Sequence, residues 1–192
     1  MKEQGLYSPL FEHENCGAGF ICSLKGIKTN DIIHKALNIL TCLEHRGAVS
    51  SDGRTGDGAG ILIEIPHEFF SKECDFDLPD PNEYAVGMVF LPQKINQSNY
   101  CIKTFEAEIF KQNLNIIGWR DVPVNAKVVG SIAAQSQPRI KQVFIGKSSP
   151  DQSEKEFNLK LYLARKISEN TIYSSPFSQK NFFYFSSLHT RT

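Results

Sequence analysis

The sequence lacks long apolar runs, net charge and a signal peptide, and each of these absences argues against a class of protein. Its 192 residues contain no apolar run longer than a strand, so no segment is long enough to cross a bilayer as a helix. The 21 basic and 21 acidic residues leave no net charge, which gives no support for nucleic-acid binding or for a basic membrane surface. The N-terminus lacks the basic start and apolar stretch of a signal peptide. We therefore expect a cytoplasmic protein that binds neither nucleic acid nor membrane.

Cysteine is also scarce, and its spacing is uninformative for metal binding. The five cysteines are odd in number, widely scattered and without a C-x-x-C pair. Neither a disulfide framework nor a metal site is expected from this pattern. Cys22 lies an even number of residues after Cys16, so in one strand both would share a face, and we interpret Cys22 as a small buried residue.

Apolar residues, by contrast, are plentiful enough for a packed core. They make up 41% of the chain, with 11% aromatic residues, which fits one domain of ordinary size or a piece of a larger one. Periodicity predicts loops at 50–60 and 71–83. It predicts helices over 30–44, over 98–114 and from 149 onward, and strands over 17–24, 61–65, 84–91, 140–145 and 181–188. Strands and helices mix without strict alternation, which favours a layered α+β or α/β arrangement over a doubly wound sheet.

Cys16 is the candidate nucleophile. It is followed by small residues and then an apolar run, and the fifteen residues that precede it are rich in polar and turn-forming types. If residues 1–15 are removed, the α-amine of Cys16 lies beside its own thiol, and a free α-amine has a pKa of about 7.7–8. One residue would then supply both nucleophile and general base. The plainer alternative is a buried structural cysteine, which an isolated cysteine more often is.

Three stretches occur in a telling order: 16–20 (CGAGF), 43–48 (LEHRGA) and 55–61 (TGDGAGI). Together they resemble the N-terminal glutaminase domain of the glutamate synthase large subunit, a class II (N-terminal nucleophile) glutamine amidotransferase. The lead-in 7–15 is similar to the short propeptide of that family, and 118–124, 138–144 and 183–192 are similar to later family segments. The resemblance covers essentially the whole chain and implies a propeptide at 1–15, followed by the N-terminal portion of the amidotransferase domain at 16–192.

The resemblance implies an N-terminal-nucleophile hydrolase fold, a four-layer α/β/β/α sandwich of class α+β. It implies that Cys16 attacks the side-chain amide of glutamine, releases ammonia and leaves a glutamyl thioester that water hydrolyses. In the complete family enzyme, a synthase domain of the same chain adds the ammonia to 2-oxoglutarate and reduces the adduct to glutamate. That step uses FMN and an iron–sulfur cluster, fed by an NAD(P)H-oxidising small subunit or by ferredoxin. No cofactor is expected in this segment.

Other residues near the motifs have more modest interpretations. Gly17 allows a substrate to approach the backbone without a Cβ clash. Arg46 follows a predicted helix end and can orient the N-terminal residue or hold a carboxylate, and the resemblance places Arg46 and Gly47 near the active site without a chemical step. His45 is interpreted as a helix C-terminal residue. The glycines of 56–60 open a predicted strand rather than a helix, which is not the context of a phosphate-binding loop.

The family's asparagine–glycine oxyanion pair lies beyond the last matched segment, as do the arginine and aspartate that hold the α-carboxylate and α-amine of glutamine. We therefore expect the 192-residue chain alone to be catalytically incompetent. Two alternatives stay open: another N-terminal-nucleophile amidohydrolase, or a truncated domain that acts at most as a binding piece.

Overall fold

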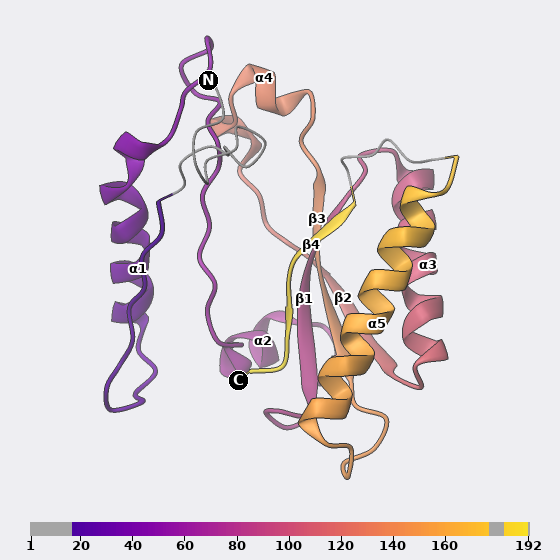
Figure 1. Ribbon diagram of the computed structural model, residues 1–192. Helices are drawn as coiled ribbons and strands as arrows, with labels where there is room; N and C mark the ends of the chain where they lie inside the picture. Colours follow the sequence, from indigo (N-terminus) through magenta and orange to yellow (C-terminus); the bar gives the residue numbers. More distant parts are fainter. Residues whose placement is uncertain (1–16, 177–182, 192) are drawn as a thin grey trace, which may run out of the picture. The chain divides into compact units, whose positions relative to one another are not determined.

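The computed structural model describes residues 17–176 and 183–191, which fall into two compact units (Figure 1). The N-terminal unit consists of residues 17–61 together with 127–134. The sheet unit consists of residues 62–126, 135–176 and 183–191. Each unit is described by itself below.

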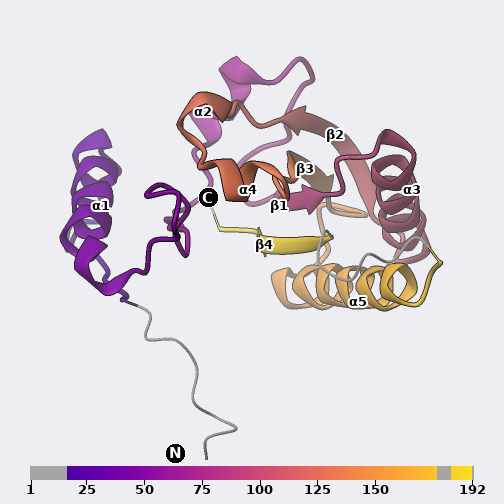
Figure 2. The same cartoon turned by 90° about the horizontal axis from the view of Figure 1, so that it is seen from above.

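The sheet unit is built on one antiparallel sheet with the strand order β2-β3-β1-β4. Figure 2 shows two long helices on one face of this sheet and a short helix on the other. The strands are β1 (Tyr84–Leu91), β2 (Asn115–Asp121), β3 (Arg139–Gly146) and β4 (Tyr184–His189). The helices are α2 (His67–Glu73) on one face, and α3 (Ile95–Lys111) and α5 (Glu154–Tyr173) on the other.

The larger core lies between the sheet and the two long helices. Successive side chains of a strand point to opposite faces, so alternate residues of β1 and β3 meet α3 and α5. Phe105 of α3 is fully buried here, with its ring centroid 4.8 Å from that of Phe185 and 6.3 Å from that of Trp119. The core also contains Ala85, Val89, Leu91, Val143, Ile145, Ile109, Phe157, Leu161 and Ala164.

The opposite face of the sheet has a smaller core under α2. Phe70 meets Phe144 edge to face, with ring centroids 5.0 Å apart. Tyr84, Val86 and Ile65 complete this buried cluster. Both faces of the sheet are therefore covered, which explains why the run 84–91 is apolar at nearly every position.

Most of the predicted elements of the sheet unit are present. The strand over 84–91 is confirmed, and the strand over 140–145 lies within β3. The helix predicted over 98–114 begins three residues earlier. The helix predicted from 149 begins instead at Glu154, because Ser153 is its N-cap and its Oγ accepts a hydrogen bond from the Glu156 N–H at 3.2 Å.

The last strand and the aromatic residues around it need smaller corrections. The strand predicted over 181–188 is β4, while Phe182 lies outside the described residues. Phe183 and Phe185 are buried in the larger core, whereas Tyr184 is 42% exposed. Arg120 and Asp121 do not pair with each other, because neighbours in a strand face opposite sides of the sheet. Salt bridges instead join Arg120 to Glu73 and Asp121 to Lys141.

The long helix in the described part of the N-terminal unit is α1 (Asn30–Cys42), which is followed by the 3₁₀ turn η2 (Glu44–Arg46). The helix predicted over 30–44 is thus confirmed, although its N-cap is Thr29, which makes no side-chain capping bond. The connection between β2 and β3 contains η3 (Ala126–Val128) and α4 (Ser131–Ala134), and the N-terminal unit takes its residues 127–134.

Two predicted strands are wrong. Residues 17–24 and 61–65 are irregular chain, in which Cys22 is exposed rather than buried and Leu62 is 76% exposed. Ile65 alone behaves as predicted, since it is 2% exposed. A strand requires a neighbouring backbone to satisfy its N–H and C=O groups, and among the described residues neither segment pairs with a strand. The α+β class is confirmed, with one sheet of the expected sandwich present in the described residues.

The helices were also compared with the requirements of a bilayer. None in the described part of the chain has the length and apolar character needed to cross a membrane.

Candidate functional site

The predicted nucleophile Cys16 and the predicted propeptide at 1–15 lie outside the described residues. The described chain begins at Gly17, the residue bonded to Cys16. The surroundings of the nucleophile are therefore built here from Gly17 onward, within the N-terminal unit.

Gly17 and Gly19 lie against the side chains of α1. A Cβ added to Gly19 would stand 2.6 Å from Cγ2 of Ile39, and one added to Gly17 would stand 2.9 Å from Cδ2 of Leu43. No larger residue fits either position without displacing its neighbour, so the close approach of backbone to helix requires glycine. The chain that leaves Cys16 is thereby held at the C-terminal end of α1.

Arg46 and Gly47 follow directly from that helix end. The N–H of Arg46 donates to the Leu43 carbonyl at 2.9 Å, and the N–H of Gly47 donates to the Glu44 carbonyl at 3.0 Å. Leu43 thus contacts Gly17 and also begins the turn that carries Arg46. The structure brings Gly17 and the Arg46–Gly47 turn to the same end of α1, with Arg46 exposed to solvent. Gly47 has a φ of −93°, which any residue adopts.

His45 is held at the helix end. Its Nδ1 lies 2.9 Å from the Cys42 carbonyl, and since a carbonyl only accepts, Nδ1 carries the hydrogen. This contact agrees with the interpretation of His45 as a helix C-terminal residue.

Residues 48–57 form a short hairpin that begins beside Gly47. The Ala48 N–H donates to Oδ2 of Asp57 at 2.8 Å, Val49 bridges Gly56, and the Ser50 N–H donates to the Thr55 carbonyl at 2.7 Å. Gly53 at its tip has a φ of +68°, a conformation that suits glycine. The sequence predicted only a loop over 50–60, because the paired segments 48–50 and 55–57 are short and partly polar and do not resemble strands.

Asp52 at the hairpin tip accepts five hydrogen bonds. Its Oδ1 accepts from the N–H groups of Thr55 at 2.8 Å and Arg54 at 3.1 Å. Its Oδ2 accepts from the Thr55 hydroxyl at 2.7 Å, the Ile132 N–H at 3.1 Å and the Ser131 hydroxyl at 3.3 Å. Hydrogen bonds from Thr55 and the Ile132 N–H hold the pKa of this carboxyl well below its usual range. The sequence showed an Asp-Gly turn here but gave no sign of the partners near residue 132.

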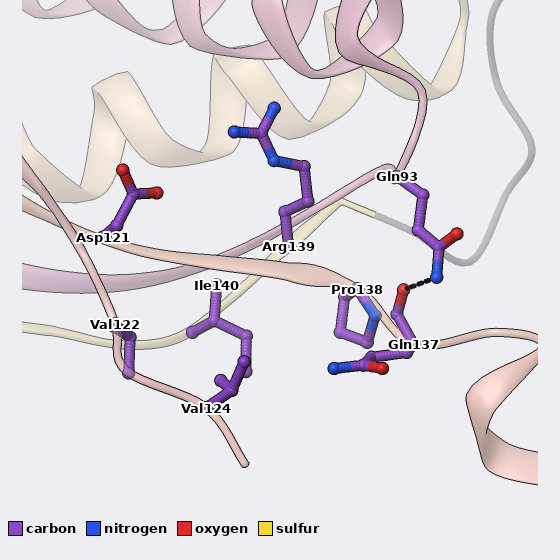
Figure 3. A pocket seen from close by; sticks show the side chains of 8 residues that line it. All are labelled: Gln93, Asp121, Val122, Val124, Gln137, Pro138, Arg139 and Ile140. Carbon is purple, nitrogen blue, oxygen red and sulfur yellow. Dashed lines mark hydrogen bonds between the residues drawn. The ribbon is translucent and has the colours of Figure 1, made fainter. Parts of the chain in front are cut away.

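The sheet unit has an open hollow of about 380 Å³ at the adjoining ends of β2 and β3. Figure 3 shows its residues: Asp121 and Arg139 point to one side of the strands and Ile140 to the other, while the Gln93 amide donates to the Gln137 carbonyl. Val122, Val124 and Pro138 complete the lining. The lining contains no thiol, hydroxyl or imidazole, so it offers no nucleophile.

Metal ligation was also tested. Within residues 17–176 and 183–191, no group of three His, Cys, Asp or Glu side chains is placed to hold a metal ion.

Comparison with known proteins relates this chain to one family and to several glutamate synthases. The sequence model of the family described as "Glutamine amidotransferases class-II" matches residues 16–192. The glutamate synthase [NADPH] large chain of Bacillus subtilis is 44% identical over 192 residues, which are 100% of this chain and 12% of that protein. The glutamate synthase [NADH] of Saccharomyces cerevisiae is 40% identical over 202 residues, 99% of this chain and 9% of that protein.

A plant relative matches a similar share of this chain. The ferredoxin-dependent glutamate synthase 1 of Arabidopsis thaliana is 36% identical over 186 residues, 95% of this chain and 11% of that protein. The chain therefore spans between 9% and 12% of the length of these relatives.

Proposed function

This chain belongs to the class II glutamine amidotransferases, and from that premise we propose that it supplies the glutaminase step of a glutamate synthase. One observation carries the proposal: the family match begins at Cys16, the residue that the sequence singles out as nucleophile, and leaves residues 1–15 outside it. The names of the relatives do not favour the alternatives of another amidohydrolase or of a binding piece without activity.

In the proposed reaction, the Cys16 thiolate attacks the side-chain amide carbon of glutamine. Its α-amine, freed by removal of residues 1–15, takes the thiol proton and delivers it to the leaving nitrogen. The C–N bond breaks, ammonia departs, and a glutamyl thioester remains on Cys16. Water then attacks the thioester, which yields glutamate and restores the thiol.

The described residues support this reaction by placement. Gly17 and Gly19 seat the chain that follows the nucleophile on α1, and the same helix end leads into Arg46. Arg46 is exposed, so its guanidinium is accessible to hold a carboxylate or to orient the new N-terminus. Gly47 beside it lines the site in this proposal.

The described part of this chain does not have the ligands for the iron–sulfur cluster of a complete glutamate synthase. An iron–sulfur cluster requires about four cysteine thiolates at one place. The free cysteines among the described residues are Cys22, Cys42, Cys74 and Cys101, and they are not gathered into a metal-binding group. We therefore assign FMN, the iron–sulfur cluster and 2-oxoglutarate to a synthase domain of a longer chain. Its electron donor would be an NAD(P)H-oxidising small subunit or ferredoxin.

The test is ammonia release from glutamine by the protein at its natural length, together with its intact mass. We expect a mass that begins at Cys16, and activity that Cys16→Ala abolishes. Cys42→Ala is the matched control, because it removes a free thiol of the N-terminal unit that the proposed reaction does not use. This variant should retain activity. Activity in Cys16→Ala, or full activity in a protein that keeps residues 1–15, would contradict the proposal.

A further inference from the structure

We infer that Asp52 is a positioning residue for the glutaminase site, holding the hairpin of residues 48–57 so that Arg46 and Gly47 at its base keep one placement. This inference rests on the proposed function. It concerns a carboxylate that takes no chemical step in the proposed reaction.

Asp52 joins two segments that are about eighty residues apart in the chain. Two of its bonds close its own turn, to the N–H groups of Arg54 and Thr55, and two reach Ser131 and Ile132 at the start of α4. Thr55 reinforces the junction, because its hydroxyl donates to Asp52 and accepts from the Ala133 N–H at 3.1 Å. We call this set of hydrogen bonds the Asp52 clip.

The Asp52 clip requires an ionised carboxylate rather than an amide. Each of its oxygens accepts at least one backbone N–H: Oδ1 from Arg54 and Thr55, and Oδ2 from Ile132. An asparagine at this position must turn its NH₂ group toward one of these donors, whichever way the amide is oriented. The other two groups that bind Asp52 are the hydroxyls of Thr55 and Ser131, and both donate to it.

The opposite side of the clip is shaped to receive it. A Cβ added to Gly130 would stand 2.3 Å from Oγ1 of Thr55, 2.6 Å from its backbone nitrogen and 2.7 Å from Oδ2 of Asp52. The backbone before α4 therefore approaches the hairpin tip as closely as glycine allows. The backbone at Gly130 thus packs directly against the Asp52 carboxylate and Thr55.

The hairpin stem transmits this anchoring to its base. The Ser50 N–H bonds to Thr55, Val49 bridges Gly56, and the Ala48 N–H bonds to Asp57, one residue from Gly47. With the tip held at α4 and the base held at η2, the segment has no free end. A site residue keeps its geometry when its supports are fixed in this way, and a misplacement near 1 Å costs up to about 100-fold in rate.

A merely structural clip would lower stability without changing the kinetics of the folded protein. The test therefore compares kcat and KM for glutamine, at 25 °C and well below the melting temperature, in the protein at its natural length. We expect Asp52→Asn and Thr55→Val to lower kcat/KM about tenfold or more. Thr55→Ser keeps the hydroxyl and should stay within about twofold of wild type. Gly130→Ala should act like Asp52→Asn, and the double variant should be no worse than the poorer single one.

Two controls match these variants. Asp31→Asn removes an exposed carboxylate of the same unit, and Gly60→Ala adds a Cβ where nothing lies within 4 Å. Both should keep wild-type kcat/KM. If Asp52→Asn and Thr55→Val match an active wild type, or if Asp31→Asn loses as much, the positioning role is wrong while the proposed function stands. A wild type that releases no ammonia from glutamine overturns both.

Discussion

The backbone of Gly19 lies directly against the side chain of Ile39 in α1. A side chain as small as one methyl at Gly19 would overlap Cγ2 of Ile39, at 2.6 Å. Gly17 and Leu43 repeat the relationship one turn of helix later, at 2.9 Å. Two pairs, each of a glycine and an aliphatic residue, thus seat this segment on α1.

The first prediction is that the destabilisation caused by an alanine at Gly17 or Gly19 is relieved only by shortening the side chain that the new Cβ would meet. Gly19→Ala should weaken the N-terminal unit by about 1–3 kcal/mol, the usual cost of overpacking. Adding Ile39→Ala removes the clashing Cγ2 and should recover about 1 kcal/mol of that loss. The measurement is hydrogen exchange of the α1 amides, which reports the free energy of opening of that region.

Crossed pairs are the control for this prediction. Gly17→Ala should be relieved by Leu43→Ala but not by Ile39→Ala, and Gly19→Ala should not be relieved by Leu43→Ala. Equal recovery in the crossed and the matched pairs would show that the contacts do not exist as described.

The second prediction concerns the larger core of the sheet unit. Phe105→Ala should destabilise the protein by about 3–5 kcal/mol, since the ring is fully buried against Phe185 and Trp119. Phe110→Ala, in the same helix, should change stability by no more than about 0.5 kcal/mol, because Phe110 is 59% exposed. Urea unfolding followed by the fluorescence of Trp119, the single tryptophan, measures both. Similar losses in the two variants would contradict the assigned core.

The sequence predicted β1, β3 and β4 because both faces of the sheet are buried, but it predicted no strand at β2. A strand that is buried on both faces, such as 84–91, is apolar at nearly every position. It can therefore be recognised from the apolar run itself, without an alternation of apolar and polar residues. The segments 17–24 and 61–65 look equally apolar, yet they are irregular. A strand forms only where a neighbouring strand can pair with its backbone, and the residues of the segment do not show whether such a neighbour exists.

The residues of the proposed site differ in how far the sequence indicates them. Cys16, Arg46 and Gly47 stand out in the sequence because their neighbours form a motif. The Asp52 clip does not stand out, since an Asp-Gly turn is common and the groups it binds near Ile132 are far away in the chain. Gly17 was predicted for substrate access, whereas the structure gives it a packing contact with Leu43.

The third prediction concerns Glu169, a buried carboxylate of α5. Arg165 donates to it at 2.8 Å, and Lys166 donates to it at 3.1 Å. Arg165 also donates to the Phe185 carbonyl of β4 at 3.1 Å and lies over the Phe185 ring. Arg165→Met should therefore destabilise the protein more than Lys166→Met, by about 1–3 kcal/mol, because it leaves a buried carbonyl without its donor. Thermal unfolding of the two variants measures the difference, and equal melting temperatures would refute it.

The fourth prediction is a pH dependence that belongs to Asp52. Its hydrogen bonds to Thr55 and Ile132 hold its pKa below the ordinary value of about 3.9, so the folded protein keeps this carboxylate ionised where the unfolded chain takes up a proton. A lowered pKa in the folded state contributes stability that is fully present above the unfolded value. That contribution is lost as the pH falls through the folded value.

The stability difference between wild type and Asp52→Asn should accordingly stay constant from pH 7 to about pH 5 and shrink below about pH 4. Hydrogen exchange of the Ile132 and Ala133 amides, corrected for intrinsic rates at each pH, follows the clip itself, because both groups donate within it. A difference that already declines between pH 7 and 5, or that grows on acidification, would mean that the carboxylate is not held by these donors. In that case the hairpin tip would have to be anchored by Thr55 alone.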